Sequence, residues 1–124
     1  MVNKEVINIG FPKAGPYSIA IKAGSLIFIS GQVPNPDDKN IKNQTLSVFG
    51  KIKAILEAAG ANVSNIVKVS VFLKSISDFT EMNKAYKEFF KQNGVIEKYP
   101  ARSTVQAVSP MPGALVEIDA IAVT

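Results

Sequence analysis

The stretch Ile66-Val67-Lys68-Val69-Ser70-Val71-Phe72-Leu73-Lys74 is the most regular segment of this chain. Val67, Val69, Val71 and Leu73 occupy alternate positions, and successive residues of a strand point to opposite faces of a sheet. One face of the segment is therefore wholly apolar, while the other carries Ile66, Lys68, Ser70 and Phe72. This pattern predicts a β-strand over 66–74 whose apolar face is covered by other elements.

Two amphipathic segments flank that strand. The first is predicted to be a helix from Gln44 to Ala59, stopped by Gly60, with a buried stripe of Leu46, Phe49, Ile52, Leu56 and Ala59. The second begins at Asp78-Phe79-Thr80-Glu81, where a carboxylate three residues after Asp78 fits a capped helix start, and it ends at Gly94. Its predicted buried stripe is Phe79, Met82, Tyr86 and Phe89.

The rest of the chain has the composition of strands and turns. Strands are predicted over 2–7, 15–21 and 26–30, with a hairpin turn over 22–25 and a loop over 33–38. Two further strands, 102–108 and 114–123, flank the proline-rich turn 109–113. The predicted order is βββ-α-β-α-ββ, an α+β fold with a mixed sheet and both helices on one face. We expect a single domain spanning residues 1–124.

Composition limits the chemistry available to the 124 residues. The sequence has no histidine, cysteine or tryptophan, so it has no imidazole base, no thiolate nucleophile and no His- or Cys-based metal site; we expect no metal and no cofactor. The net charge of +4 comes from scattered lysines and not from a cluster of cations, a pattern that argues against nucleic-acid binding. No membrane-spanning run or signal peptide is recognisable, and a cytoplasmic protein is expected.

Arg102 is the sole arginine, and its planar fork suits two-point binding of a small carboxylate or phosphate. If the last two strands pair antiparallel about their turn, Arg102 lies opposite Glu117 and Asp119. The resulting face is half apolar, which favours coverage by another copy of the chain. The alternative is a cross-strand Arg–Glu ion pair without function.

Other polar residues are ambiguous on their own. Tyr17 is equally a packed strand aromatic, and Ser30 and Thr104 are equally hydrogen-bonded strand hydroxyls. Gly31 would allow a ligand close to the backbone, and Asn83 is equally a solvated helix position.

Taken together, seven segments closely resemble the Rid (YjgF/RidA) family of imine and enamine deaminases. They cover nearly the whole chain in order and are 12–18, 29–34, 53–61, 67–73, 78–90, 100–105 and 115–122. The central motifs are Ile29-Ser30-Gly31-Gln32-Val33-Pro34 and Pro100-Ala101-Arg102-Ser103-Thr104-Val105.

The resemblance implies a chorismate-mutase-like fold of the bacillary type, assembled as a homotrimer. The three sheets would form a central β-barrel, with a ligand cleft at each subunit interface. The family's carboxylate-binding arginine matches Arg102. Its interface tyrosine matches Tyr17, and its water-positioning acid matches Glu117. Its ligand contacts match Ser30, Gly31 and Thr104, and its helix asparagine near the neighbouring subunit's cleft matches Asn83.

The implied activity is hydrolysis of reactive 2-imino acids and enamines, such as 2-iminobutanoate and 2-iminopropanoate, to 2-keto acids and ammonia, without a cofactor. The alternatives are a non-catalytic protein that binds or senses small 2-keto acids, or an endoribonuclease that inhibits translation. The chain departs from the family pattern at several positions, namely Lys51 for asparagine, Thr104 for cysteine, Met111 for proline and Asp119 for glutamate.

Overall fold

The computed structural model describes residues 3–124, which form one six-stranded sheet covered by two helices. The strands are β1 (Lys4–Ile7), β2 (Ala20–Ala23), β3 (Leu26–Gln32), β4 (Ile66–Leu73), β5 (Ala101–Gln106) and β6 (Val116–Val123). The helices are α1 (Ile41–Ala58) and α2 (Phe79–Gln92), and two short 3-10 turns cover Val63–Asn65 and Ile76–Asp78. The predicted element order is therefore confirmed.

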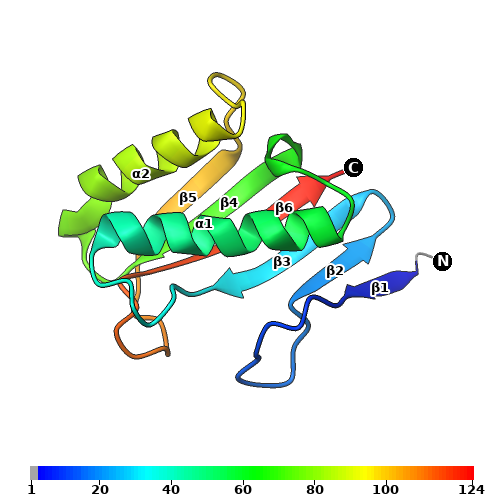
Figure 1. Ribbon diagram of the computed structural model, residues 1–124, viewed down its shortest axis with the longest axis horizontal. Helices are drawn as coiled ribbons and strands as arrows, with labels where there is room; N and C mark the ends of the chain where they lie inside the picture. The colour runs from blue at the N-terminus through cyan, green and yellow to red at the C-terminus, as the bar shows by residue number, and fades with distance from the viewer. Residues whose placement is uncertain (1–2) are drawn as a thin grey trace.

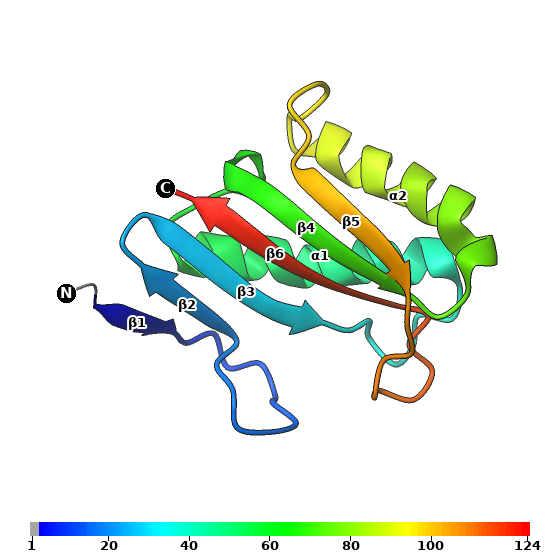
Figure 2. The ribbon, with the colours of Figure 1, turned by 180° about the vertical axis from the view of Figure 1, so that it is seen from behind.

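The sheet is mixed, and its strand order is β1-β2-β3-β6-β4-β5. β4 and β5 run parallel, and the remaining neighbours are antiparallel. Both helices lie on the same face, as Figure 1 shows from the helix side and Figure 2 from behind. The opposite face of the sheet carries no helix, and we call it the open face.

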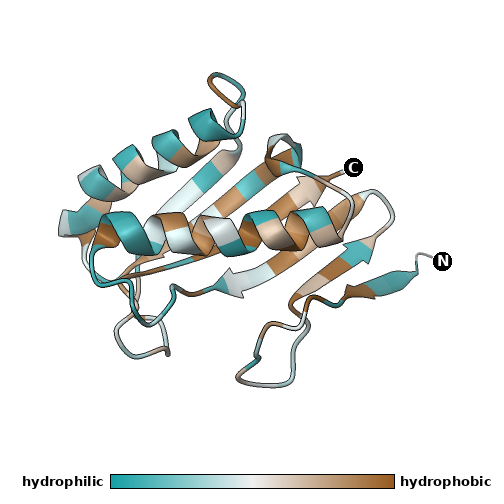
Figure 3. Ribbon diagram, viewed as in Figure 1, coloured by the Kyte–Doolittle hydropathy of each residue, from teal (hydrophilic) through white to brown (hydrophobic). Residues whose placement is uncertain are grey.

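The core lies between the helices and the sheet. Phe49 of α1 packs against Tyr86, Phe89 and Phe90 of α2 at ring-centre distances of 4.7–5.5 Å. Hydrophobic residues concentrate in the central strands, whereas hydrophilic residues run along α2 (Figure 3). Burying aromatic side chains in such clusters is a large contribution to stability.

The expected antiparallel pairing of the last two strands is wrong. β4 lies between β5 and β6, and β5 pairs with β4 in parallel. The reason is burial: alternate residues of β6, such as Ile118 and Ala122, are fully buried, which places β6 at the centre of the sheet. The more polar β5 is an edge strand, a position that tolerates exposed polar side chains.

Several boundaries differ from the prediction for local reasons. The expected strand 15–21 starts only at Ala20, because the prolines and glycines of the preceding loop interrupt strand pairing. Helix α1 starts three residues earlier than predicted, at Ile41, because the Asn40 side chain caps it by accepting from the Asn43 amide at 2.8 Å. The part of strand 2–7 that falls on Val2 lies outside the described residues.

Three side-chain expectations are also corrected. A bulge between Ile66 and Lys68 turns Val67 outward, where it is 44% exposed. Asp78 makes no capping hydrogen bond, because a 3-10 turn runs directly into α2. Phe79, predicted to be buried, is exposed and contacts Arg102 instead.

Candidate functional site

Arg102 projects toward the helix side of the sheet. It pairs with Val69 of β4, and paired residues share a face; Val69 is fully buried beneath the helices. The guanidinium carbon lies 4.8 Å from the centre of the Tyr86 ring and 5.7 Å from that of Phe79. Aromatic faces hold a guanidinium by cation–π attraction without using its N–H donors. Those donors remain available to a ligand.

Arg102 also has no acidic partner within its own chain. Among residues 3–124 one ion pair is found, between Lys84 and Glu81 at 3.1 Å on the exposed side of α2, and it does not involve Arg102. The alternative of a cross-strand Arg102–Glu117 ion pair is therefore wrong.

Two buried hydroxyls near Arg102 have no hydrogen-bond partner in the described structure: the Oη of Tyr86 and the Oγ1 of Thr104. Thr104 shares a face of β5 with Arg102, since residues two apart in a strand point the same way. A buried hydroxyl without a partner costs about 1–3 kcal/mol. These two groups are therefore free to bond a ligand held by Arg102.

Asn83 belongs to the same region. It lies four residues after Phe79 and three before Tyr86 on α2, a spacing that puts the three on one side of a helix. We call Asn83, Arg102 and Thr104 the arginine half-site, with the rings of Phe79 and Tyr86 as its walls.

Burial raises the pKa of Tyr86 to about 12, although the nearby Arg102 charge acts in the opposite direction. The Tyr86 phenol therefore ionises at a higher pH in the folded chain than in the unfolded chain, where its pKa is the ordinary 10. The stability that this difference contributes is fully present below pH 10 and is lost as the pH rises toward 12. We therefore expect Tyr86→Phe to unfold less steeply with pH between 10 and 12 than the wild type. At pH 7 its melting temperature should stay equal or rise, because the hydroxyl it removes has no partner.

Thermal unfolding followed at several pH values would check this. Tyr17→Phe is the control, because Tyr17 is exposed and is not among the groups that shift the pKa of Tyr86. A Tyr86→Phe protein that is strongly destabilised at pH 7 would show that the hydroxyl is bonded.

Glu117 lies on the open face, because it pairs with Phe72 and not with the buried residues of β4. One carboxylate oxygen accepts a hydrogen bond of 2.8 Å from the Ser109 hydroxyl, which itself accepts from the Met111 amide at 3.2 Å. The other oxygen rests against Gly31, in the irregular part of β3 between Ile29 and Gln32. A Cβ at position 31 would collide with this carboxylate, so a larger residue there would displace the Glu117 side chain from its present position.

Ser30 and Tyr17 lie beside Gly31. The Ser30 hydroxyl donates to the Ser18 carbonyl at 2.6 Å, which ties β3 to the preceding loop. Tyr17 is 43% exposed, and its Oη accepts a bond of 3.3 Å from the Ala14 amide. Tyr17 and Gly31 both line a cavity of ≈960 Å³ at this edge. We call Tyr17, Ser30, Gly31 and Glu117 the acid half-site.

The two half-sites are separate within one chain. β4 lies between the strands that carry Arg102 and Glu117, and the two side chains project from opposite faces. The predicted face shared by Arg102, Glu117 and Asp119 is therefore wrong. Asp119 does lie on the open face with Glu117, paired with Ser70.

Three residues at these sites were not predicted as site residues. Phe79 and Tyr86 were assigned to the buried stripe of α2, although the Tyr86 hydroxyl needs a polar neighbour when buried. Ser109 was assigned to a turn, and only the path of that turn beside β6 brings it to Glu117. Within residues 3–124 no group of three or more His, Cys, Asp or Glu side chains could hold a metal ion.

Residues 10–124 match the family described as Endoribonuclease L-PSP. The chain belongs to this family. A RutC family protein of Pyrococcus horikoshii is 48% identical over 116 residues, which are 87% of this chain and 86% of that protein. A protein of Dermatophagoides farinae named 2-iminobutanoate/2-iminopropanoate deaminase is 36% identical over 115 residues, covering 88% and 86% of the two chains.

The family fold is also confirmed by solved structures. The structure of Escherichia coli TdcF with bound serine superposes with a TM-score of 0.89 at 33% identity, covering 97% of this chain and 98% of that one. The resemblance to Rid proteins and the predicted chorismate-mutase-like α+β fold are thus confirmed. None of the helices in the described part of the chain is long and apolar enough to cross a membrane.

Proposed function

We propose that this protein hydrolyses small 2-imino acids, such as 2-iminobutanoate and 2-iminopropanoate, to 2-keto acids and ammonia. The observation that carries this proposal is the state of Arg102. Its guanidinium rests on two aromatic rings, lacks an acidic partner and stands beside unbonded hydroxyls. Such a group is prepared to bind a small carboxylate in two-point contact.

Two similar proteins support the same choice of ligand. One is named as a deaminase of these two imino acids, and the other was solved with serine bound. Serine, like a 2-imino acid, carries a carboxylate on the carbon that bears its nitrogen. The same recognition chemistry therefore serves both ligands.

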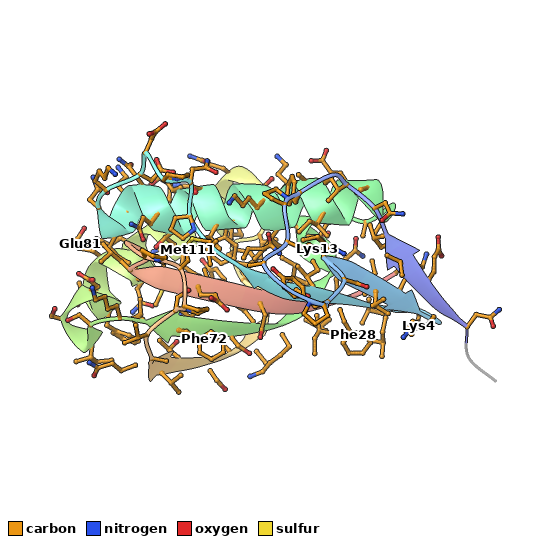
Figure 4. All side chains as sticks on the ribbon, turned by 90° about the horizontal axis from the view of Figure 1, so that it is seen from below. Lys4, Lys13, Phe28, Phe72, Glu81 and Met111 are labelled. Carbon is orange, nitrogen blue, oxygen red and sulfur yellow. The ribbon has the colours of Figure 1, made fainter. Side chains whose placement is uncertain are left out.

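We further propose that the reaction takes place between copies of the chain in a homotrimer. The two half-sites face away from each other in one chain, so a neighbouring copy is needed to bring an arginine half-site to an acid half-site. The open face offers the surface for such contact, because Phe28 is 41% and Val105 48% exposed on it. Figure 4 shows Phe28 and Phe72 projecting from the sheet on the side away from α1. An apolar face of this kind favours association.

In this cleft Arg102 would bind the substrate carboxylate, with Thr104 and Asn83 as further polar contacts. Glu117, held by Ser109, would take a proton from water as the water oxygen bonds to the imine carbon. Glu117 would return this proton to the imine nitrogen, which gives the carbinolamine. As the C–N bond then breaks, the carbinolamine hydroxyl becomes the carbonyl and its proton passes by way of Glu117 to the departing nitrogen, so that ammonia leaves and the 2-keto acid remains. Positioned proton transfer of this kind contributes roughly 10²–10⁴-fold. Tyr17 would orient the water.

A mixing experiment tests the shared cleft. Arg102→Ala and Glu117→Gln proteins, each inactive alone, should regain activity when their subunits are exchanged. In a trimer assembled at random from equal amounts, about one quarter of the clefts combine both intact residues. The measurement is ammonia release from freshly generated 2-iminobutanoate before and after exchange, with differently tagged subunits to confirm mixed trimers. Mixed trimers without recovered activity would show that one chain supplies both residues.

The alternative of a binding protein without turnover is favoured by the serine-bound relative. Calorimetric binding of 2-ketobutanoate by a wild type that releases no ammonia would establish it. The ribonuclease named in the family description lacks support from the composition, since the chain has no histidine. RNA cleavage that persists in Arg102→Ala after extensive purification would revive it.

A further inference from the structure

The cavity beside the acid half-site extends well beyond Tyr17 and Gly31, the two lining residues that belong to that half-site. The cavity of ≈960 Å³ lies between the loop that precedes β2, the loop that follows β3, helix α1 and the proline-rich turn before β6. Arg102, Thr104 and Asn83 do not line it. Figure 4 views the molecule toward this edge, with Lys13 and Met111 labelled beside α1. Pockets of about 300–1,000 Å³ accommodate drug-sized ligands, so this volume exceeds the needs of a four-carbon imino acid.

The walls of the cavity are largely apolar. Phe11, Ile19, Val33 and Met111 line it together with several prolines. Gln44, one of the polar residues that line it, is already bonded: its amide donates to the Asp38 and Gly113 carbonyls, and its oxygen accepts from the Leu115 amide. Gln44 therefore ties two loop segments, the one after β3 and the one before β6, to α1 and stabilises the shape of the cavity.

Cations outnumber anions in the lining. Lys13, Lys39 and Lys51 contribute three ammonium groups against the single carboxylate of Asp38. Lys39 and Lys51 are anchored, because their Nζ atoms donate to the Pro36 and Val33 carbonyls at 2.7 Å each. An ammonium group has three donors, so each anchored lysine keeps two for a ligand.

Lys51 is the most enclosed of these cations. It is half-buried on α1, and no carboxylate of the described residues forms an ion pair with it. Desolvation lowers the pKa of Lys51, and the Asp38 charge offsets this only in part. A cation that has lost water without gaining an anionic partner binds an incoming anion more strongly than an exposed one does.

We propose that this cavity binds an organic monoanion with an extended apolar body, of the class of a medium-chain carboxylate. The carboxylate would bind Lys51, and the hydrocarbon would lie against Phe11, Ile19 and Val33. This ligand is distinct from the substrate of the Arg102 site. Because Gly31 lines the cavity and also contacts the Glu117 carboxylate, occupancy has a direct route to the acid half-site.

The test is calorimetric titration of the full chain with octanoate. We expect saturable binding of one octanoate per chain, weaker binding of butanoate and no binding of uncharged 1-octanol. Lys51→Met, which keeps the length of the side chain and removes its charge, should weaken octanoate binding at least tenfold. Lys51→Arg should retain most of the affinity.

Two controls separate this site from the proposed active site. Lys53→Met removes the same charge from an exposed position of α1 and should bind like the wild type. Arg102→Ala should also bind octanoate normally, even though it is expected to lose deaminase activity. Absence of saturable binding, equal affinity in Lys51→Met, or loss of binding in Arg102→Ala would each overturn the proposal.

Discussion

Arg102→Ala is expected to abolish most ammonia release from 2-iminobutanoate while the fold persists. The guanidinium is the only group of its half-site able to grip a carboxylate at two points, and misplacement of a substrate by about 1 Å can cost 10²-fold in rate. We therefore expect kcat/KM to fall by at least about 10²-fold. The assay should generate the imine enzymatically and follow ammonia, with subunit number measured on the same sample.

Two variants show which property of Arg102 matters. Arg102→Lys keeps the charge but lacks the planar fork, and its activity should lie between those of the wild type and Arg102→Ala. Lys98→Ala removes a charge from an exposed residue shortly before β5 and should behave as wild type. If Arg102→Ala retained near-normal kcat/KM, the carboxylate clamp would be ruled out.

Much of the fold was predictable because it depends on local periodicity. Alternating apolar residues in 66–73 and 116–122 identified strands that are buried on one face, and the stripes of α1 and α2 identified the helices. These patterns also predict which face meets the helices. They contain no information about which strands are neighbours, since a parallel and an antiparallel partner present the same alternation.

The error at β5 follows from that limit. The proline-rich turn suggested a hairpin, yet the linker carries the chain past β4 before β6 begins. Because β5 and β6 do not pair with each other, Arg102 and Glu117 do not lie opposite each other as expected. Arg102 stands out in the sequence by its chemistry, and Glu117 by the resemblance to the Rid family. The contacts of Gly31 with Glu117 and of Tyr86 with Arg102 join segments far apart in the sequence. Such contacts become visible only in three dimensions.

Glu117→Gln is expected to lower kcat by about 10²–10⁴-fold with little change in KM. The amide keeps the shape of the side chain, and its oxygen can still accept the Ser109 hydrogen bond, so the fold and the arginine half-site should be intact. What the amide cannot do is accept a proton from the attacking water. Asp119→Asn is the matched control, because it makes the same change on the same face of β6, two residues away.

Steady-state kinetics of both variants on 2-iminobutanoate would decide the role of Glu117. A loss confined to Glu117→Gln, expressed in kcat and not in KM, is the signature of a group that moves a proton and does not bind the carboxylate. Equal losses in Asp119→Asn would instead reflect the summed negative charge of the open face. A rise in KM alone would assign Glu117 to binding, and the half-site carrying Gly31 and Tyr17 would then hold the substrate without activating water.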